Sequence, residues 1–183
     1  VDISGDRIAV GSDNSDIGAN ADQGAVYTFS RSTGTWVQES KIVDATGAVG
    51  DLFGDALSLD RDRIAIGAYN DDDAAGLAQG SVSIYNWSTS TSTWVLDVKL
   101  LAPDAAASDE FGGSVAIIDR VLAVGAPARD PSALTSAGAL YLFRDESTTA
   151  FGQAGWALHA EYSAADAAAS DTLGTVVALR EHF

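Results

Sequence analysis

Four short runs of apolar residues recur in the same order along the chain, and they predict a repeat built from four strands. The first follows a Phe-Gly or Leu-Gly pair, the second is small and ends in Gly, the third opens on Gly, and the fourth opens on Trp. Matching positions lie 56 to 62 residues apart. Such a unit must stack on its own copies to bury its faces. The repeated structural positions are Phe53, Gly54, Gly67, Phe111, Gly112, Gly125, Trp36, Trp94 and Trp156.

The character of each run predicts its place in the sheet. The second reads RIAVG, RIAIG and VLAVG, which is typical of a strand covered on both faces near the axis of the repeat. Strict alternation in the fourth run predicts a half-exposed outer strand. Trp87, at the end of a third run, is predicted to be an exposed contact residue. In residues 94–100 alternation predicts one face of Trp94, Leu96, Val98 and Leu100, and another of Val95, Asp97 and Lys99.

Units with small inner strands and amphipathic outer strands are typical of β-propeller blades. We therefore predict an all-β fold of four-stranded antiparallel blades, with a straight solenoid as the competing architecture. Propellers close with about four to eight blades, and the chain opens and closes within a unit, so we expect a fragment with about three blades of a larger ring. The predicted boundaries are a partial blade 1–50, blades 51–108 and 109–170, and the start of another at 171–183.

The charge balance narrows the classes of partner. The chain carries 26 acidic and 10 basic residues, a net charge of -16, and no cysteine. A field of that sign repels phosphate backbones and anionic lipids, which excludes nucleic acid and membrane-surface partners. No apolar run approaches the roughly 20 residues that cross a bilayer, so we expect no membrane insertion. The absence of cysteine excludes a disulfide framework.

The segments DLFGDALSLDRDRIAIGAYN and DEFGGSVAIIDRVLAVGAP resemble the FG-GAP repeat. The Phe-Gly and Gly-Ala-Pro signatures are literal in the third unit, at Phe111-Gly112 and Gly125-Ala126-Pro127. The resemblance implies the seven-bladed propeller of integrin α subunits and of bacterial exported proteins, and hence an extracellular or cell-surface location. In integrin-type repeats a calcium loop joins the two signature strands. Here that connection is too short to supply the five or more oxygens that Ca²⁺ needs, so the family's metal residues do not carry over.

A different acidic loop follows each Gly-ended strand and is the candidate cation site. Crowded carboxylates repel one another unless a cation or solvent screens them, so these loops are the candidate Ca²⁺ site. A solvated turn that uses Asp and Asn for turn geometry is the favoured alternative, and the third copy has lost most of the acids. The candidate residues are Asp13, Asn14, Asp16 and Asp22 in the first loop and Asn70, Asp71, Asp72 and Asp73 in the second.

A pair of aspartates also recurs in the connection before each Phe-Gly or Leu-Gly pair. Because the position is constant, we predict that these side chains close turns by accepting backbone N–H groups. The pairs are Asp44 with Asp51, Asp104 with Asp109, and Asp166 with Asp171.

The sequence offers few candidate catalytic residues. The chain has two histidines, His159 and His182, and neither belongs to a recurring nucleophile pattern. We therefore predict that it is not an enzyme. Two hypotheses remain. The first is an adhesion scaffold that presents blade loops to a protein or glycan partner, with cation assistance. The second is a structural repeat that contacts neighbouring subunits of an assembly and binds no diffusible ligand.

Overall fold

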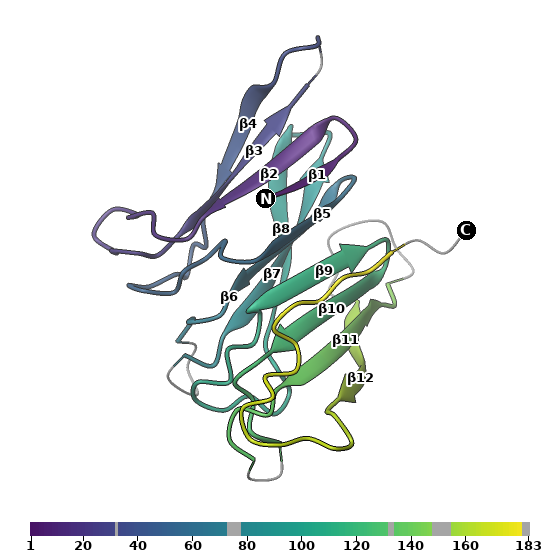
Figure 1. Ribbon diagram of the computed structural model, residues 1–183. Coiled ribbons are helices and arrows are strands. Elements are labelled where there is room, and N and C mark those ends of the chain that lie inside the picture. The colour runs from purple at the N-terminus through teal and green to yellow at the C-terminus, as the bar shows by residue number, and fades with distance from the viewer. Residues whose placement is uncertain (32, 73–77, 132–133, 148–154, 181–183) are drawn as a thin grey trace.

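The computed structural model describes residues 1–31, 33–72, 78–131, 134–147 and 155–180, and these residues contain no α-helix (Figure 1). Within these residues, twelve strands form three four-stranded antiparallel sheets, each in sequential order. Sheet 1 contains β1 (Asp2–Ser4), β2 (Arg7–Ser12), β3 (Ala25–Ser30) and β4 (Val37–Ile42). Sheet 2 contains β5 (Leu57–Asp60), β6 (Arg63–Ala68), β7 (Ser81–Ser88) and β8 (Thr93–Leu100). Sheet 3 contains β9 (Ser114–Ile118), β10 (Val121–Ala126), β11 (Ala139–Asp145) and β12 (Trp156–Tyr162).

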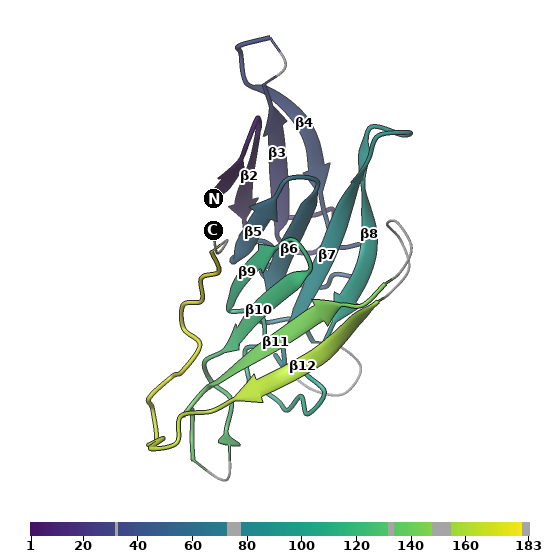
Figure 2. The ribbon, with the colours of Figure 1, turned by 90° about the vertical axis from the view of Figure 1, so that its right-hand side faces the viewer.

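The sheets pack face to face as propeller blades do, so the prediction of an all-β fold with four-stranded blades is confirmed (Figure 2). The first strands β1, β5 and β9 lie innermost, where β5 contacts both β1 and β9, and the small apolar strands β2, β6 and β10 come next. The axis therefore lies beside the short first strand of each unit. A ring of seven blades stays a prediction.

Polar side chains on each inner strand satisfy backbone groups of the next inner strand. The carboxylate of Asp2 accepts the N–H of Leu59 at 2.8 Å, and the hydroxyl of Ser58 accepts the N–H of Ile117 at 3.2 Å. These bonds occupy donors that would otherwise stand unpaired at the edge of a sheet. The polar residues of the innermost strands therefore form hydrogen bonds from one sheet to the next beside the axis.

The hydrophobic cores lie between the sheets and not within one sheet. One cluster joins sheets 1 and 2 around Phe53 and Ile64, and a larger one joins sheets 2 and 3 around Phe111 and Leu122. The ring of Phe111 meets that of Tyr141 edge to face, with centroids 5.3 Å apart. Burial of one such side chain contributes about 2–3 kcal/mol, so each unit depends on its neighbour for stability.

The Phe-Gly pair fastens each unit to the one before it. The N–H of Phe53 donates to the carbonyl of Gln23 at 2.9 Å, and the N–H of Phe111 donates to that of Gln79 at 3.0 Å. The carbonyl of the following Gly then lies against the Gly that ends the second strand of the preceding unit. A Cβ atom at Gly67 would collide with the carbonyl oxygen of Gly112. Glycine is therefore required where the two backbones meet.

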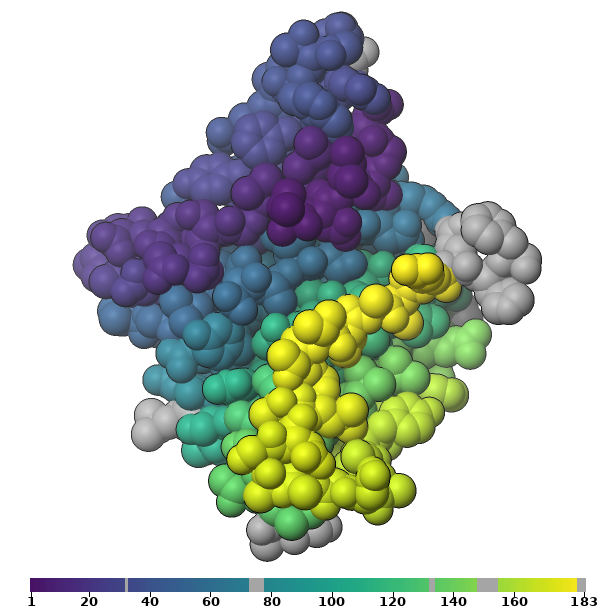
Figure 3. Space-filling model, in the orientation of Figure 1, coloured from purple at the N-terminus to yellow at the C-terminus, as the bar shows by residue number. Residues whose placement is uncertain are grey.

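The C-terminal segment repeats this docking on sheet 3. Residues 163–180 lie along the outside of that sheet (Figure 3). The N–H of Leu173 donates to the carbonyl of Ala137 at 3.0 Å, and the carbonyl of Gly174 lies against Gly125. The Leu-Gly pair therefore takes the place that a Phe-Gly pair takes on the other two sheets.

The prediction of two strictly alternating faces along residues 94–100 is wrong, because a β-bulge interrupts the pairing of β8. Tyr85 pairs with Leu96, whereas the adjacent Ile84 pairs with Val98, so Asp97 is an extra residue. Since side chains alternate with a period of two, one inserted residue exchanges the two faces beyond it.

The bulge divides the apolar side chains of β8 between two cores. Trp94 packs against the cluster between sheets 1 and 2, whereas Val98 and Leu100 belong to the cluster between sheets 2 and 3. The same irregularity recurs in sheets 1 and 3, where Glu39 and His159 are the extra residues. The outer strand β8 therefore contributes to the cores on both sides of sheet 2.

Candidate functional site

All the long connections between β2 and β3, between β4 and β5, and at the equivalent places in the other units lie at one end of the sheets. We call this end the loop face. It comprises the described parts of residues 13–24, 43–56, 69–80, 101–113 and 127–138. The opposite end carries tight turns such as residues 61–62 and 119–120. Connections alternate ends in an antiparallel meander, so the sequence order itself gathers the long loops on one side.

An aspartate closes each of the three loops that follow the second strand. The carboxylate of Asp16 accepts the N–H of Asp22 at 3.0 Å, and that of Asp130 accepts the N–H of Ser136 at 2.5 Å. Asp72 accepts the N–H of Ala78 in the same way. Each donor residue has a positive φ. One turn geometry therefore recurs in all three units, including the one that has lost most of its acids.

Several of the predicted cation ligands that the structure describes have other partners. Asp13 accepts a hydrogen bond from the Asn14 amide at 2.7 Å, while the Asn70 amide donates to the carbonyl of Gly50 at 2.5 Å. Asp71 is buried against Lys99, and Asp73 lies outside the described residues. Among the residues that the structure describes, no three His, Cys, Asp or Glu side chains converge to hold a metal ion.

The second aspartate of each connection closes a turn, as predicted, and Asp44 does so too by accepting the N–H of Thr46 at 2.8 Å. Asp51 accepts the N–H of Ala48 at 2.6 Å, and Asp109 accepts the N–H of Ala106 at 2.9 Å. Asp171 does the same for the N–H of Ala168, at 2.7 Å. The identical bond three residues back in every unit explains why this aspartate recurs.

One lysine neutralises the acids between sheets 1 and 2. We call Asp44, Asp51, Asp71 and Lys99 the first charge cluster. The Lys99 ammonium lies 2.5 Å from a carboxylate oxygen of Asp71 and 3.1 Å from one of Asp44. Both acids are buried. The cluster therefore holds a connection of the loop face against the outer strand of sheet 2.

The acids of the first charge cluster titrate differently. Burial opposes ionisation of Asp44, but hydrogen bonds from Thr46 and the charge of Lys99 outweigh it and lower the pKa of Asp44. Burial dominates at Asp51 and, with the charge of Asp71, raises the pKa of Asp51. Burial would lower the pKa of Lys99, but its bond to Asp71 raises that pKa instead. Lys99 therefore stays charged when the protein is folded at neutral pH.

Between sheets 2 and 3 an arginine, Arg129, neutralises the acids of the connection. We call Asp104, Asp109, Arg129 and Tyr141 the second charge cluster. Arg129 pairs with Asp104 and lies 3.8 Å from a carboxylate oxygen of Asp109. The hydroxyl of Tyr141 donates to Asp104 at 2.9 Å. Burial opposes ionisation of Asp104, but the bonds from Arg129 and Tyr141 lower the pKa of Asp104.

The two charge clusters are related by an exchange of signs. Arg129 occupies the loop position of Asp71, three residues after the end of the second strand. Glu161 occupies the strand position of Lys99, since the two pair with Tyr141 and Ser83 at the same point of the third strand. The cation therefore lies on a strand in the first charge cluster and on a loop in the second, and each cluster includes two acids from the connection. In the sequence, the signal for this exchange is that each unit carries few basic residues, and that Lys99 and Arg129 are among them.

At the opposite end, an arginine of one sheet reaches a tryptophan of the next. The Arg7 guanidinium lies 4.3 Å from the ring centroid of Trp87 and 5.6 Å from that of Trp94, and it pairs with Glu39 at 3.3 Å. Trp87 is therefore partly buried beneath Arg7. Such stacking contributes about 1 kcal/mol at a partly exposed site.

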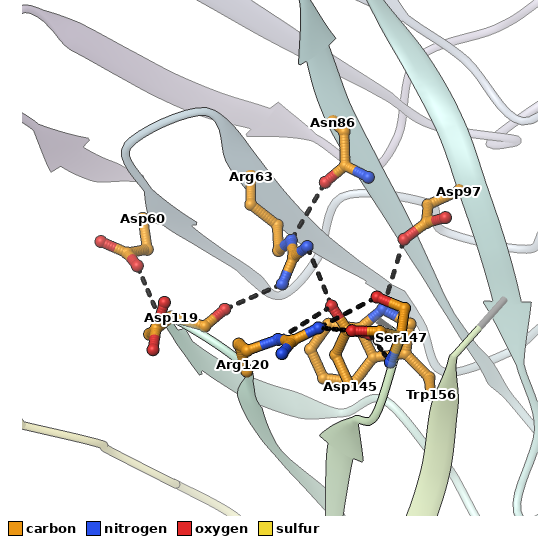
Figure 4. Close-up of polar contacts among 9 residues, drawn as sticks. All are labelled: Asp60, Arg63, Asn86, Asp97, Asp119, Arg120, Asp145, Ser147 and Trp156. Carbon is orange, nitrogen blue, oxygen red and sulfur yellow. Dashed lines mark hydrogen bonds and ion pairs between the residues drawn. The ribbon is translucent and has the colours of Figure 1, made fainter. Parts of the chain in front are cut away.

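Sheets 2 and 3 repeat the contact with Arg63 (Figure 4). Its guanidinium lies 5.2 Å from the centroid of Trp156, and it donates to Asn86 at 3.0 Å and to the carbonyl of Asp119 at 2.9 Å. The same group pairs with the buried Asp145 at 3.2 Å. Arg7 and Arg63 hold equivalent positions in their units, although sequence reasoning gave them no role.

The repeated tryptophans also bond across the sheets. The indole N–H of Trp94 donates to the hydroxyl of Thr28 at 3.2 Å, and that of Trp156 donates to Asp97 at 3.3 Å. Trp36 lies beneath Arg31 of its own sheet, 5.2 Å from ring centroid to guanidinium. These contacts give the repeated tryptophans a structural task.

One family model matches the chain. It is described as an FG-GAP repeat and covers residues 36–85 and 94–143, together more than half of the sequence. Each matched segment begins at a repeated Trp and ends in the third strand of the following sheet. No curated protein matches the chain. The described ranges hold no helix of the length and apolarity that a bilayer crossing needs.

Proposed function

The chain belongs to the FG-GAP repeat family, and from that premise we propose that it is a non-catalytic binding scaffold whose loop face contacts a protein or glycan partner outside the cell. The FG-GAP repeat is a structural and binding repeat typical of extracellular proteins. Binding residues in such folds stand on loops that a rigid framework positions.

The loop face supports this proposal because the same loop-closing hydrogen bond recurs there while the side chains between its ends vary. The closing bonds from Asp16 and Asp130 are the same in two units. The residues between those bonds differ, since Asn20 and Ala21 of the first loop correspond to Leu134 and Thr135 of the third. A recognition face needs this combination of fixed geometry and varied chemistry.

A structural module of an extracellular assembly is the second candidate. It is favoured by the number of recurring polar residues that join one sheet to the next, such as Arg7, Arg63 and Lys99. In that case neighbouring subunits would be the partners, and the loops would carry no ligand.

Binding assays on variants of the two ends test the proposal. The purified chain is applied to a glycan array and to a library of displayed surface proteins, and any ligand is titrated. We expect Asn14→Lys with Ala19→Lys, on the loop face, to weaken binding by about tenfold or more. Thr33→Lys with Thr35→Lys adds the same charge to exposed positions at the opposite end and should change nothing. Absence of any ligand would favour the structural module.

A further inference from the structure

The glycine of each Phe-Gly pair links two adjacent sheets. The carbonyl of Gly112 lies against Gly67 of the preceding sheet, and its N–H donates to the carbonyl of Gly125 in its own sheet at 3.0 Å. Gly54 makes the same two contacts, since its carbonyl lies against Gly11 and its N–H donates to the carbonyl of Gly67 at 2.9 Å. The pair therefore joins the second strand of one sheet to the second strand of the next.

The Leu-Gly pair makes only the first of these contacts. The carbonyl of Gly174 lies against Gly125 of sheet 3. The turn that follows is the same as in the other units, since the N–H of Thr175 donates to the carbonyl of Thr172 at 3.2 Å. Among the residues that the structure describes, no carbonyl accepts the N–H of Gly174. This glycine is therefore joined to sheet 3 and to no described sheet on its other side.

Residues 176–180 take the place of an inner strand but pair with no second strand. In sheets 2 and 3 the Phe-Gly pair leads directly into β5 and β9, which pair with β6 and β10. Residues 176–180 belong to no strand of the described chain, although their exposure alternates as in a strand. Val177 and Leu179 are half-buried, whereas Val176 is 83% exposed. An extended segment with a free edge is a template for pairing with another chain.

The second strand of sheet 1 offers a matching edge. Its inner strand β1 has three residues, against four in β5 and five in β9. It pairs only with residues 7–9 of β2. In the described part of the chain Val10 and Gly11 therefore have no partner on that side, whereas Ile66, the equivalent of Val10, pairs with Leu57. The inner edge of β2 is thus partly free and held by a short strand.

Both outward sides of the stack expose side chains whose counterparts are buried. Ile3 of sheet 1 is 60% exposed, whereas Leu59 and Ile117 at the same position are 5% and 4% exposed. Tyr162 of sheet 3 is 50% exposed, whereas Leu100 at its position is 9% exposed. Each outward side therefore presents the apolar pattern that neighbouring sheets bury against each other.

Charge complementarity favours a second copy of this chain as the partner. Lys41 occupies the strand position of Lys99, but it is exposed and pairs with no carboxylate of the described ranges. Asp166 occupies the connection position of Asp44, which pairs with Lys99 at 3.1 Å, and it is also exposed. The outward side of sheet 1 therefore offers a cation to the acid beside sheet 3.

The arginine–tryptophan contacts fit the same pairing. Trp94 and Trp156 each lie beneath an arginine of the preceding sheet, whereas Trp36 lies beneath Arg31 of its own sheet. At the first position of its second strand, where sheets 1 and 2 carry that arginine, sheet 3 carries Val121. Sheet 3 would therefore bring no second guanidinium to the ring of Trp36, and like charges would not meet there.

We propose that residues 174–180 of one copy pair with β2 of a second copy, in place of its β1. The N–H of Gly174 then bonds to the carbonyl of Gly11, and Val177 lies opposite Val10, in the register that β5 has with β6. Sheet 3 of one copy thereby stacks on sheet 1 of the other. Because each copy offers one segment and one edge, the association is head to tail. It requires no ligand on the loop face.

Sedimentation of the full chain between about 1 μM and 1 mM tests the association, and we expect larger species as the concentration rises. Leu179→Asp places a charge where the two sheets would bury it and should weaken association by about tenfold or more. Val49→Asp makes the same kind of change at a residue that is 62% exposed and lies outside the segment, and it should leave association unchanged. Thermal melting establishes that both variants fold.

Disulfide trapping tests the register, because the chain has no cysteine of its own. Val10→Cys is mixed with Val177→Cys under oxidised glutathione, and a linked heterodimer is expected since facing Cβ atoms in a ladder lie about 4.5–5.5 Å apart. Val176→Cys is the control. It is more exposed, but it lies one residue out of register and its side chain points to the opposite face, so it should link at least about tenfold less.

Three results would overturn the proposal. The chain may stay monomeric up to about 1 mM, in which case a second copy is not the partner of this segment. Association may be as strong in Leu179→Asp as in the wild type, which would place the contact elsewhere on the surface. Val176→Cys may link to Val10→Cys as readily as Val177→Cys does, which would show random collision and no strand register.

Discussion

At Gly67 the backbone of one unit touches that of the next, and the contact leaves no room for a side chain. We expect Gly67→Ala to destabilise the protein by about 3 kcal/mol, because a methyl group there must push the carbonyl of Gly112 away. Gly5→Ala is the control, since its Cβ would meet nothing within 4 Å and costs only about 1 kcal/mol for the left-handed backbone. Urea unfolding of both variants measures the difference, and equal losses would contradict the docking geometry.

Acid should weaken the first charge cluster through Asp44. Its folded pKa lies below the ordinary 3.8, so the unfolded state binds more protons and stability falls as the pH drops through this range. We expect the melting-temperature gap between wild type and Asp44→Asn to be full near about pH 6 and smaller near about pH 3. The exposed Asp166→Asn is the control and should show a small gap at both values. A gap that persists in acid would refute this assignment.

The residue scale also shows what the sequence could predict. The Asp51, Asp109 and Asp171 turn closures follow from position alone, because the bond spans three residues. The partners of Lys99 and Arg129 come from segments far apart along the chain. No local pattern specifies them, so the charge clusters became visible only in the fold.

At the scale of the element, the third and fourth strands of every unit share one bulge. Alternation predicted the strand at residues 94–100 correctly, but placed Val98 and Leu100 on the same face as Trp94, whereas they pack on the opposite face. A bulge inserts one residue without changing composition, so hydrophobic periodicity cannot locate it. Its recurrence at Glu39 and His159 puts a polar residue at that point of each outer strand.

The exchange of signs between the charge clusters predicts a rescue. Asp71→Arg alone places a second cation beside Lys99, and Lys99→Glu alone leaves three acids without their cation. Each single variant should lower the free energy of unfolding by about 3 kcal/mol. The double variant copies the arrangement of Arg129 and Glu161 and should recover all but about 1 kcal/mol. A double-mutant cycle measures the coupling.

The rescue has its own control. Lys41 is exposed and occupies the position in sheet 1 that Lys99 occupies in sheet 2. Asp71→Arg combined with Lys41→Glu should therefore show no recovery. Additive losses in the Asp71 and Lys99 pair as well would show that the two residues are not coupled.

At the scale of the whole molecule, the units are joined by docking pairs, inner-strand bonds, apolar cores, charge clusters and arginine–tryptophan contacts. The repeat spacing predicted the sheets and their face-to-face packing, because a unit of four strands has no other place to bury its apolar residues. The arginine–tryptophan contacts could not be predicted in this way, because Arg7 and Trp87 come from segments far apart in the sequence.

Calcium should add little to the stability of the whole chain. Asp16 and Asp72 of the loop face already accept backbone N–H groups, and Asp71 faces Lys99. We expect the melting temperature with EDTA to match that with about 1 mM Ca²⁺, because a ligand of the native state alone would raise it. Mg²⁺ and NaCl at equal ionic strength control for screening of the net charge of -16. A rise in melting temperature specific to Ca²⁺ would instead support the loop acids as a metal site.

The two matched segments differ in what they would carry into a chimaera. Residues 94–143 contain the whole second charge cluster, so this cassette brings its own counter-ion to a new host. Residues 36–85 contain Asp44, Asp51 and Asp71 but leave Lys99 behind. An engineer who transplants that cassette must therefore also supply a lysine downstream, whereas the other can be grafted unaided.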